Sequence, residues 1–127
     1  MANTFKLKTK ANVGVTTVGI YTAPAATTTV VIGITLANTS GSGVNVGVGI
    51  TRAGTTEDVK LLKNAPIPQG SSLEFMGGNK VVLEATDTVT VDSDTNNSVD
   101  ASLTIMEITY DGTYPNWKYW YQYWNKI

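Results

Sequence analysis

Apolar and polar residues alternate with a period of two along most of the chain, which predicts short β-strands separated by turns. Glycine, proline, asparagine and serine fill the connections, above all at residues 38–43 and 64–72. Many short strands with turn residues between them are typical of a β-sandwich or jelly roll. The expected strands cover residues 4–10, 13–22, 28–38, 44–51, 59–63, 73–76, 80–84, 88–92 and 99–109.

This pattern predicts an all-β fold, an antiparallel β-sandwich of the jelly-roll type. We expect one sandwich domain over residues 1–110 and an aromatic-rich C-terminal extension over residues 111–127, which would act as a docking segment. No internal repeat divides the sandwich domain further.

The first strand has the clearest two-residue alternation. Phe5 and Leu7 alternate with Lys6, Lys8 and Lys10. We therefore expect the two apolar residues to face the core and the lysines to form a charged outer face. A row of lysines would also protect a sheet edge from unwanted strand pairing.

Residues 28–38 and 44–51 flank a loop rich in serine and glycine, which favours an antiparallel hairpin between them. Gly47 and Gly49 alternate on one face of the second strand, where another backbone could approach closely. The first strand of this pair is expected to present one apolar face, formed by Val30, Ile32, Ile34 and Leu36.

Composition agrees with the β prediction and excludes several functions. Thr (20), Val (14) and Ile (8) make up a third of the 127 residues, and these β-branched residues favour strands. The chain has no histidine and no cysteine, so it cannot build a Ser-His-Asp or Cys-His nucleophile, a thiolate redox centre or a usual zinc site. We therefore expect no enzyme activity and no cofactor.

The charge and hydropathy of the chain narrow the classes of partner that it is expected to bind. A net charge of −1 and a pI near 5.2 argue against broad binding to nucleic acid or anionic membranes. No apolar run approaches the roughly 20 residues that span a bilayer, and the basic start of the chain lacks the apolar core of a signal peptide. The first ten residues hold three lysines and residues 84–111 hold seven acids and no base, which would allow electrostatic contact between neighbouring copies.

Aromatic residues concentrate at the C-terminal end. Residues 114–124 contain seven of the eleven aromatic residues, and their spacing fits one face of a helix and a strand equally well. This segment could dock into a neighbouring subunit, fold back over its own sandwich or stack on sugars, and docking is our first expectation. The candidate partner-binding residues are Tyr114, Trp117, Tyr119, Trp120, Tyr121, Tyr123 and Trp124, together with the lysines Lys6, Lys8 and Lys10.

The acidic loop at residues 92–100 begins like a calcium-binding loop. The glycine and glutamate that complete an EF-hand loop are replaced by Asn97 and Leu103, so that pattern fails. We therefore predict no metal site. Two interpretations of the loop stay open, a loop that holds a cation and an ordinary solvated turn. Both are compatible with the oxygen-bearing residues Asp92, Asp94, Asn96 and Asp100.

Four segments resemble a group of small β-sandwich virion proteins from tailed bacteriophages, many of them cyanophages. The resemblance extends over about residues 3–109 and rests on turn and strand motifs. Ala26 and Thr86 stand where the group usually has glycine, and the extension after Asp111 lies outside the shared pattern. The segments are IYTAPAATTTVV (20–31), ITLAN (34–38), APIPQGSSLE (65–74) and KVVLEATDTV (80–89).

The resemblance implies a structural component of the virion, made in the host cytoplasm. Our first expectation is a capsid decoration (cement) protein that bridges capsid subunits as a homo-oligomer, with a trimer favoured. Its partner would be the major capsid protein or another virion protein. The alternatives are an adaptor at the neck, tail or fibre, and a carbohydrate-binding module that stacks Trp117, Trp120 and Trp124 on sugar rings.

Overall fold

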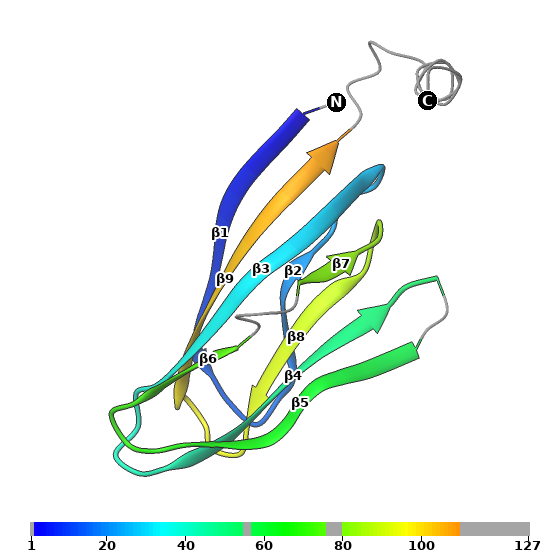
Figure 1. The fold of residues 1–127 in the computed structure, drawn as a ribbon. Coiled ribbons are helices and arrows are strands. Elements are labelled where there is room, and N and C mark those ends of the chain that lie inside the picture. The colour runs from blue at the N-terminus through cyan, green and yellow to red at the C-terminus, as the bar shows by residue number, and fades with distance from the viewer. Residues whose placement is uncertain (1, 55–56, 76–79, 110–127) are drawn as a thin grey trace, which may run out of the picture.

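A computed structural model describes residues 2–54, 57–75 and 80–109 of the chain (Figure 1). Throughout these ranges the regular structure is β-strand, and no helix long and apolar enough to cross a membrane is found there. The strands are β1 (Ala2–Val13), β2 (Val18–Thr22), β3 (Thr27–Asn38), β4 (Val44–Arg52), β5 (Glu57–Ile67), β6 (Ser72–Phe75), β7 (Val81–Leu83), β8 (Thr88–Ser93) and β9 (Val99–Thr109).

The strands form two antiparallel sheets. Sheet A has the order β1-β9-β3-β6, and β7 also pairs with β3, whereas sheet B has the order β2-β8-β4-β5. Strand β6 pairs with residues 34–37 of β3 and β7 with residues 29–31, so the two short strands share one position at the edge of sheet A. Figure 1 shows the two sheets as separate layers, with the start of β1 beside the end of β9.

The connections confirm the jelly-roll prediction. The chain passes from one sheet to the other at every connection except the β4–β5 hairpin and the link between β6 and β7. Two sheets interleaved in this way are the double Greek key of a jelly roll.

The predicted hairpin between residues 28–38 and 44–51 is wrong. Both segments are strands, but β3 lies in sheet A, whereas β4 lies in sheet B and pairs with β5 and β8. A short loop with turn residues looks the same in sequence whether it closes a hairpin or carries the chain across to the opposite sheet. Strand β5 also continues to Ile67, through part of the loop expected at residues 64–72.

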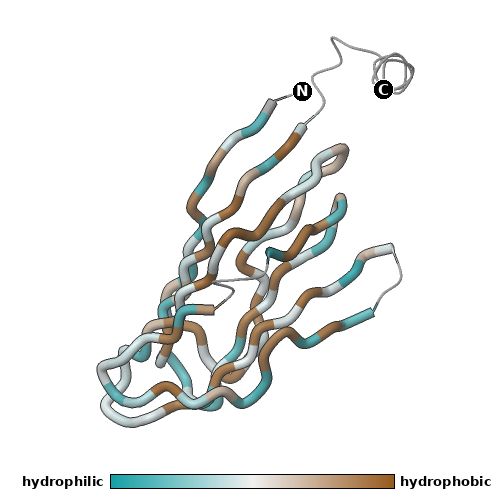
Figure 2. The backbone as a smooth tube through the Cα atoms, viewed as in Figure 1, coloured by the Kyte–Doolittle hydropathy of each residue, from teal (hydrophilic) through white to brown (hydrophobic). Residues whose placement is uncertain are grey.

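The core lies between the inner faces of the two sheets, and hydrophobic and hydrophilic positions alternate along their strands (Figure 2). In β3 a register shift between Val31 and Gly33 interrupts this alternation. Because of that shift, Val31 is buried, while Val30 and Ile32 are only partly buried, which corrects the single apolar face expected for this strand. The largest fully buried side chains are Ile34, Leu36, Ile67, Leu83, Leu103, Ile105, Val13, Val31, Val46, Val48, Val89 and Val91.

The faces of β1 are the reverse of the prediction. Residues directly opposite each other in an antiparallel pair share a face, and the lysines of β1 lie opposite buried residues of β9. Phe5 and Leu7 point to the outer face of sheet A and are 69% and 65% exposed. The pairs that set this register are Lys6–Ile105, Lys8–Leu103 and Lys10–Ala101.

The position of β1 explains why lysines can occupy an inner face. Strands β1 and β2 are the edge strands of the two sheets on this side, and Lys6 and Lys10 are exposed, so the sandwich is open to solvent along this side. A lysine can lie along such an opening and keep its ammonium group in water. The Lys6 side chain is 43% exposed, in agreement with this arrangement.

Candidate functional site

An apolar row runs across the outer face of sheet A. Phe5 of β1 lies opposite Met106 of β9, Met106 lies opposite Val30 of β3, and Val30 lies opposite Val82 of β7. Together these four residues form the outer apolar row. Phe5 is 69% exposed and Val82 is 58% exposed, whereas Met106 and Val30 are partly buried.

The row is widened on either side by Leu7 of β1 and Ile108 of β9, which also lie outside the core. None of these side chains carries a charge. A contiguous exposed apolar surface on a small protein is typical of an interaction site. The outer apolar row is therefore the candidate docking surface within the described residues.

Further along the same face, sheet A carries a shallow hollow of about 290 Å³. Small side chains form most of it, and its charged members are Lys10 and Asp100. The Asp100 carboxylate accepts a hydrogen bond of 3.0 Å from the Asn12 N–H, which gives it a structural role at the edge of the hollow. Its lining is Thr9, Lys10, Ala11, Thr35, Ala37, Asp100, Ala101 and Ser102.

A buried polar network joins the two sheets beside the open edge. The Tyr21 hydroxyl of β2 donates a hydrogen bond of 2.6 Å to Oε2 of Glu107 on β9. Because the single tyrosine hydrogen is used there, the Thr29 hydroxyl, 2.8 Å away, donates to the Tyr21 oxygen. The Lys6 Nζ lies 2.8 Å from the other Glu107 oxygen. Both carboxylate oxygens of Glu107 are thus satisfied within the chain.

This network shifts two pKa values. Burial and the bond to Glu107 raise the pKa of Tyr21 to about 12, so the phenol stays protonated at neutral pH. The bonds from Lys6 and Tyr21 lower the pKa of Glu107 and outweigh its desolvation. A carboxylate that is charged at neutral pH and a phenol that is neutral there suit a structural bridge, not proton transfer.

The structure places the three predicted partner-binding lysines differently from one another. Lys6 forms the ion pair with Glu107, and the Lys8 Nζ lies 6.0 Å from the centre of the Tyr21 ring, at cation–π distance. Lys10 lines the shallow hollow. Two of the three thus make contacts within the chain, and their role toward a partner stays a prediction.

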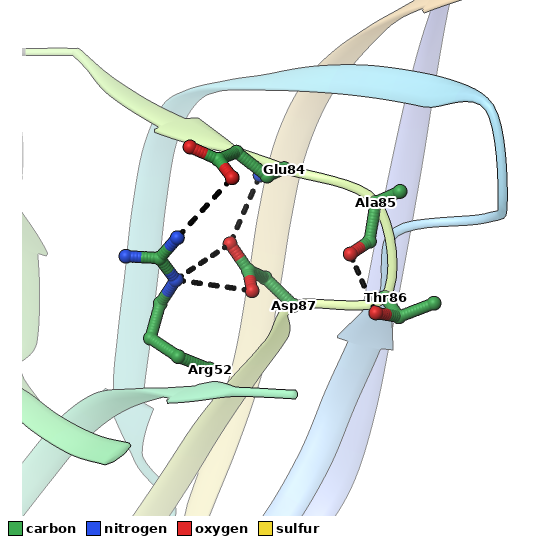
Figure 3. Close-up of polar contacts among 5 residues, drawn as sticks. All are labelled: Arg52, Glu84, Ala85, Thr86 and Asp87. Atoms are coloured by element: carbon green, nitrogen blue, oxygen red, sulfur yellow. Dashed lines mark hydrogen bonds and ion pairs between the residues drawn. The ribbon is translucent and has the colours of Figure 1, made fainter. Parts of the chain in front are cut away.

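A second polar cluster fixes the corner between β7 and β8 to β4 (Figure 3). The Arg52 Nε lies 3.1 Å from each carboxylate oxygen of Asp87, and an Arg52 terminal nitrogen lies 3.3 Å from Oε2 of Glu84. The backbone N–H of Glu84 donates to Asp87 across 2.9 Å. Asp87 is buried and fully engaged, so this cluster holds the corner in place and offers no free acid or base.

The acidic loop between β8 and β9 uses its oxygens to fasten neighbouring segments. They accept hydrogen bonds from the N–H groups of Asn12, Val15 and Asn45 and from the Thr17 hydroxyl. Among the described residues, no three His, Cys, Asp or Glu side chains are grouped closely enough to hold a metal. Asp100 accepts from Asn12, Asn96 from Val15, Asp94 from Asn45 and Asp92 from Thr17.

The predicted aromatic segment, residues 114–124, lies outside the described residues, so its docking role stays a prediction. The outer apolar row was not predicted from the sequence. The available signal was the alternation of Phe5 and Leu7 with lysines, which pointed to the correct periodicity but to the wrong face.

No family model matches the chain, and no curated protein matches it. A structure of infectious bursal disease virus, Gx strain, has a TM-score of 0.54 at 13% identity and covers 89% of this chain, which spans only 33% of that viral chain. A structure of Bacillus endospore appendages, described as disulfide-linked pili, has a TM-score of 0.51 at 17% identity over 85% of this chain and 87% of the other. The capsid asymmetric unit of cyanophage Pam1 has a TM-score of 0.49 at 13% identity, with 85% and 86% coverage. At these identities, the first two similarities establish the fold alone.

Proposed function

We propose that this chain is a non-enzymatic structural protein of a bacteriophage virion, and specifically a capsid decoration (cement) protein that bridges capsid subunits. The observation that carries the proposal is the exposed outer apolar row on one sheet of a complete jelly roll. Such a surface suits permanent attachment to another protein, because association removes it from water.

Two further observations support this role. The segments at residues 20–31 and 80–89 resemble motifs of phage virion proteins, and the fold is shared with a viral structure. The whole chain lacks histidine and cysteine, and the acids of its described polar clusters are engaged in structural bonds. The described part of the chain therefore suits a rigid body with an attachment surface.

In this proposal the sandwich supplies rigidity and sheet A faces the capsid. The outer apolar row and the aromatic segment 114–124 together provide the anchor toward the major capsid protein or another virion protein. A homo-oligomer, with a trimer favoured, would repeat this anchor and strengthen attachment through multivalency. The protein would be made in the host cytoplasm and assembled into the virion.

The pilus structure points to a different assembly for the same fold. Pili described as disulfide-linked use cysteine, and this chain has none, so its copies cannot be joined in that way. Assembly by non-covalent contacts alone agrees better with an apolar attachment surface.

Copy number in purified particles tests the proposal. Quantitative mass spectrometry would compare peptides of this chain with peptides of the major capsid protein from the same digest. On the order of hundreds of copies per particle is expected for a shell protein, since icosahedral symmetry multiplies each site. A handful to a few dozen would overturn the decoration role in favour of a neck, tail or fibre adaptor.

Absence from particles would overturn the virion role altogether. A titration of tryptophan fluorescence with glycans would then test the carbohydrate-binding alternative. Decoration proteins are expected to show no saturable response, so the same titration serves as a negative control for the main proposal.

A further inference from the structure

We propose that the aromatic segment 114–124 packs onto the outer apolar row of its own chain and forms a third layer on sheet A. The inference goes beyond the virion role, because this packing belongs to the isolated chain. It relies on the proposed function only for the identity of the partner, which would displace the segment from the row on attachment to the virion.

The receiving surface is built from the described residues. Phe5, Met106, Val30 and Val82 follow one another across four strands, and Leu7 adds a further 65% exposed side chain beside them. Four strands at about 4.8 Å spacing give the row a width of about 14 Å. No described segment covers it, since Phe5, Leu7 and Val82 are all more than half exposed.

The segment matches this surface in chemistry and in size. Residues 114–124 carry seven aromatic side chains and one charge, at Lys118. Eleven residues span about 16 Å as a helix and more than 30 Å when extended, so either conformation crosses all four strands. The proposal therefore does not depend on which of the two conformations the segment adopts.

The attachment point favours the segment of the same chain. Strand β9 ends at Thr109, which pairs with Ala2 and Thr27, so the chain leaves sheet A directly beside Ile108 at the margin of the row. Five residues connect Thr109 to residue 114 inclusive and reach at most about 17 Å, which spans the width of the row. Asp111 and Gly112 in this connection are suited to a turn back toward the sheet.

A second copy would have to compete with this tethered segment. A short flexible tether gives an effective concentration in the millimolar range, and a free copy in dilute solution is far below that level. The same-chain contact is therefore the expected one in the isolated protein.

The three tryptophans of the chain, Trp117, Trp120 and Trp124, all lie in this segment, so tryptophan fluorescence reports on the segment alone. We expect the full-length protein to show a blue-shifted emission and weak quenching by acrylamide. The full-length double variant Phe5→Ser/Leu7→Ser should lose this protection and shift the emission toward that of free N-acetyltryptophanamide. Both substituted side chains are exposed, so the far-UV circular dichroism should stay that of the parent fold.

The matched control is Val15→Ser. Val15 is 57% exposed but lies in the turn after β1, outside the row, so its substitution should leave emission and quenching unchanged. Equal quenching of the parent and the Phe5→Ser/Leu7→Ser variant would overturn the proposal, because the tryptophans would then not rest on the row.

A mixing experiment separates the same chain from a second copy. The partner in the mixture is a full-length chain with Trp117→Ala, Trp120→Ala and Trp124→Ala, which has an intact row and no tryptophan signal. Adding it to the Phe5→Ser/Leu7→Ser variant should restore no protection. Restored protection would show that the row accepts the segment of another copy and would overturn the same-chain assignment. None of these results bears on copy number in particles, so a failure here is distinguishable from a failure of the virion proposal.

Discussion

Thr86 lies in the corner between β7 and β8 with a backbone φ of 69°, in the left-handed region. A non-glycine residue there costs about 1–2 kcal/mol because its Cβ approaches the backbone, and a β-branched residue is especially unfavourable. The corner nevertheless holds this conformation, because the Thr86 N–H donates to the Ala23 carbonyl across 2.8 Å and the Ala23 N–H donates to the Asp87 carbonyl across 2.9 Å. Phage proteins with similar motifs usually have glycine at this position.

Replacing Thr86 with glycine should therefore stabilise the fold. The substitution relieves the strain of about 1–2 kcal/mol and loses about 0.5–1 kcal/mol through the greater freedom of glycine in the unfolded chain. The side chain is exposed and its hydroxyl donates to the adjacent Ala85 carbonyl, so little packing is lost (Figure 3). The net expectation is a gain of about 0.5–1 kcal/mol in the free energy of unfolding and a rise of roughly 2–4 °C in Tm.

Urea unfolding followed by far-UV circular dichroism, with calorimetry for Tm, measures this change. The matched control is Thr16→Gly, at an exposed threonine whose φ is not positive, which should lower stability by about 0.5–1 kcal/mol. Ala26, with a φ of 56°, should gain less from glycine because alanine is not β-branched. A midpoint for Thr86→Gly at or below that of the parent chain, with the m-value unchanged, would refute the strain argument.

Two further stability predictions follow from the core and the buried network. Glu107→Gln should cost about 2 kcal/mol at neutral pH, because it removes a charged acceptor from Lys6 and Tyr21. The lowered pKa of Glu107 adds stability above the pKa of an unfolded glutamate, and this contribution is lost as pH falls through the folded-state pKa. Urea midpoints across pH should therefore converge for parent and variant in acid, and a constant gap would contradict the linkage. Gly49→Ala should cost about 1–3 kcal/mol, since a Cβ there would lie 2.9 Å from the Val59 carbonyl oxygen, while Gly41→Ala, with open space around it, should show no loss.

Element positions could be predicted from the sequence because strand alternation and turn residues are local signals. The predicted strand at residues 99–109 coincides with β9, and the strands at 88–92 and 44–51 differ from β8 and β4 by one residue at one end. The close backbone approach expected at Gly47 and Gly49 is confirmed at Gly49, where an added Cβ would lie 2.9 Å from the Val59 carbonyl oxygen. At Gly47 the nearest atom is Oδ1 of the Asp92 side chain, at 2.8 Å.

Strand pairing could not be predicted from such local signals, because the paired strands of a jelly roll lie far apart in the sequence. The loop at residues 38–43 carries hairpin residues yet connects two different sheets. The local sequence shows that the chain turns at this loop. Which sheet the next strand joins depends instead on how hydrophobic surface is buried across the whole domain. The bulge in β3 similarly follows from its pairing with β9, and its local marker is Gly33 inside the strand.

The candidate site was predictable only in part. The sequence identified the aromatic segment as an apolar surface in need of a partner, and that prediction lies on residues outside the described ranges. The outer apolar row arises from residues on four strands, so no single window of the sequence contains it. A docking surface assembled across a sheet becomes visible only when the register of every strand is known.

The register of β1 links the buried network to the outer apolar row. A shift of one residue against β9 would turn Phe5 and Leu7 inward and the lysines outward, which is the arrangement that alternation alone predicts. Burying those two apolar side chains would gain about 1.5–3 kcal/mol each. It would also leave Glu107, which is 5% exposed, without Lys6, and removing one partner of a buried ion pair costs about 3–5 kcal/mol. The two terms nearly balance, so an apolar cover over Phe5 and Leu7, as proposed above for the aromatic segment, would favour the observed register, because that register keeps the ion pair and gives both side chains an apolar contact. The exposed apolar row and the buried glutamate are then two consequences of one register.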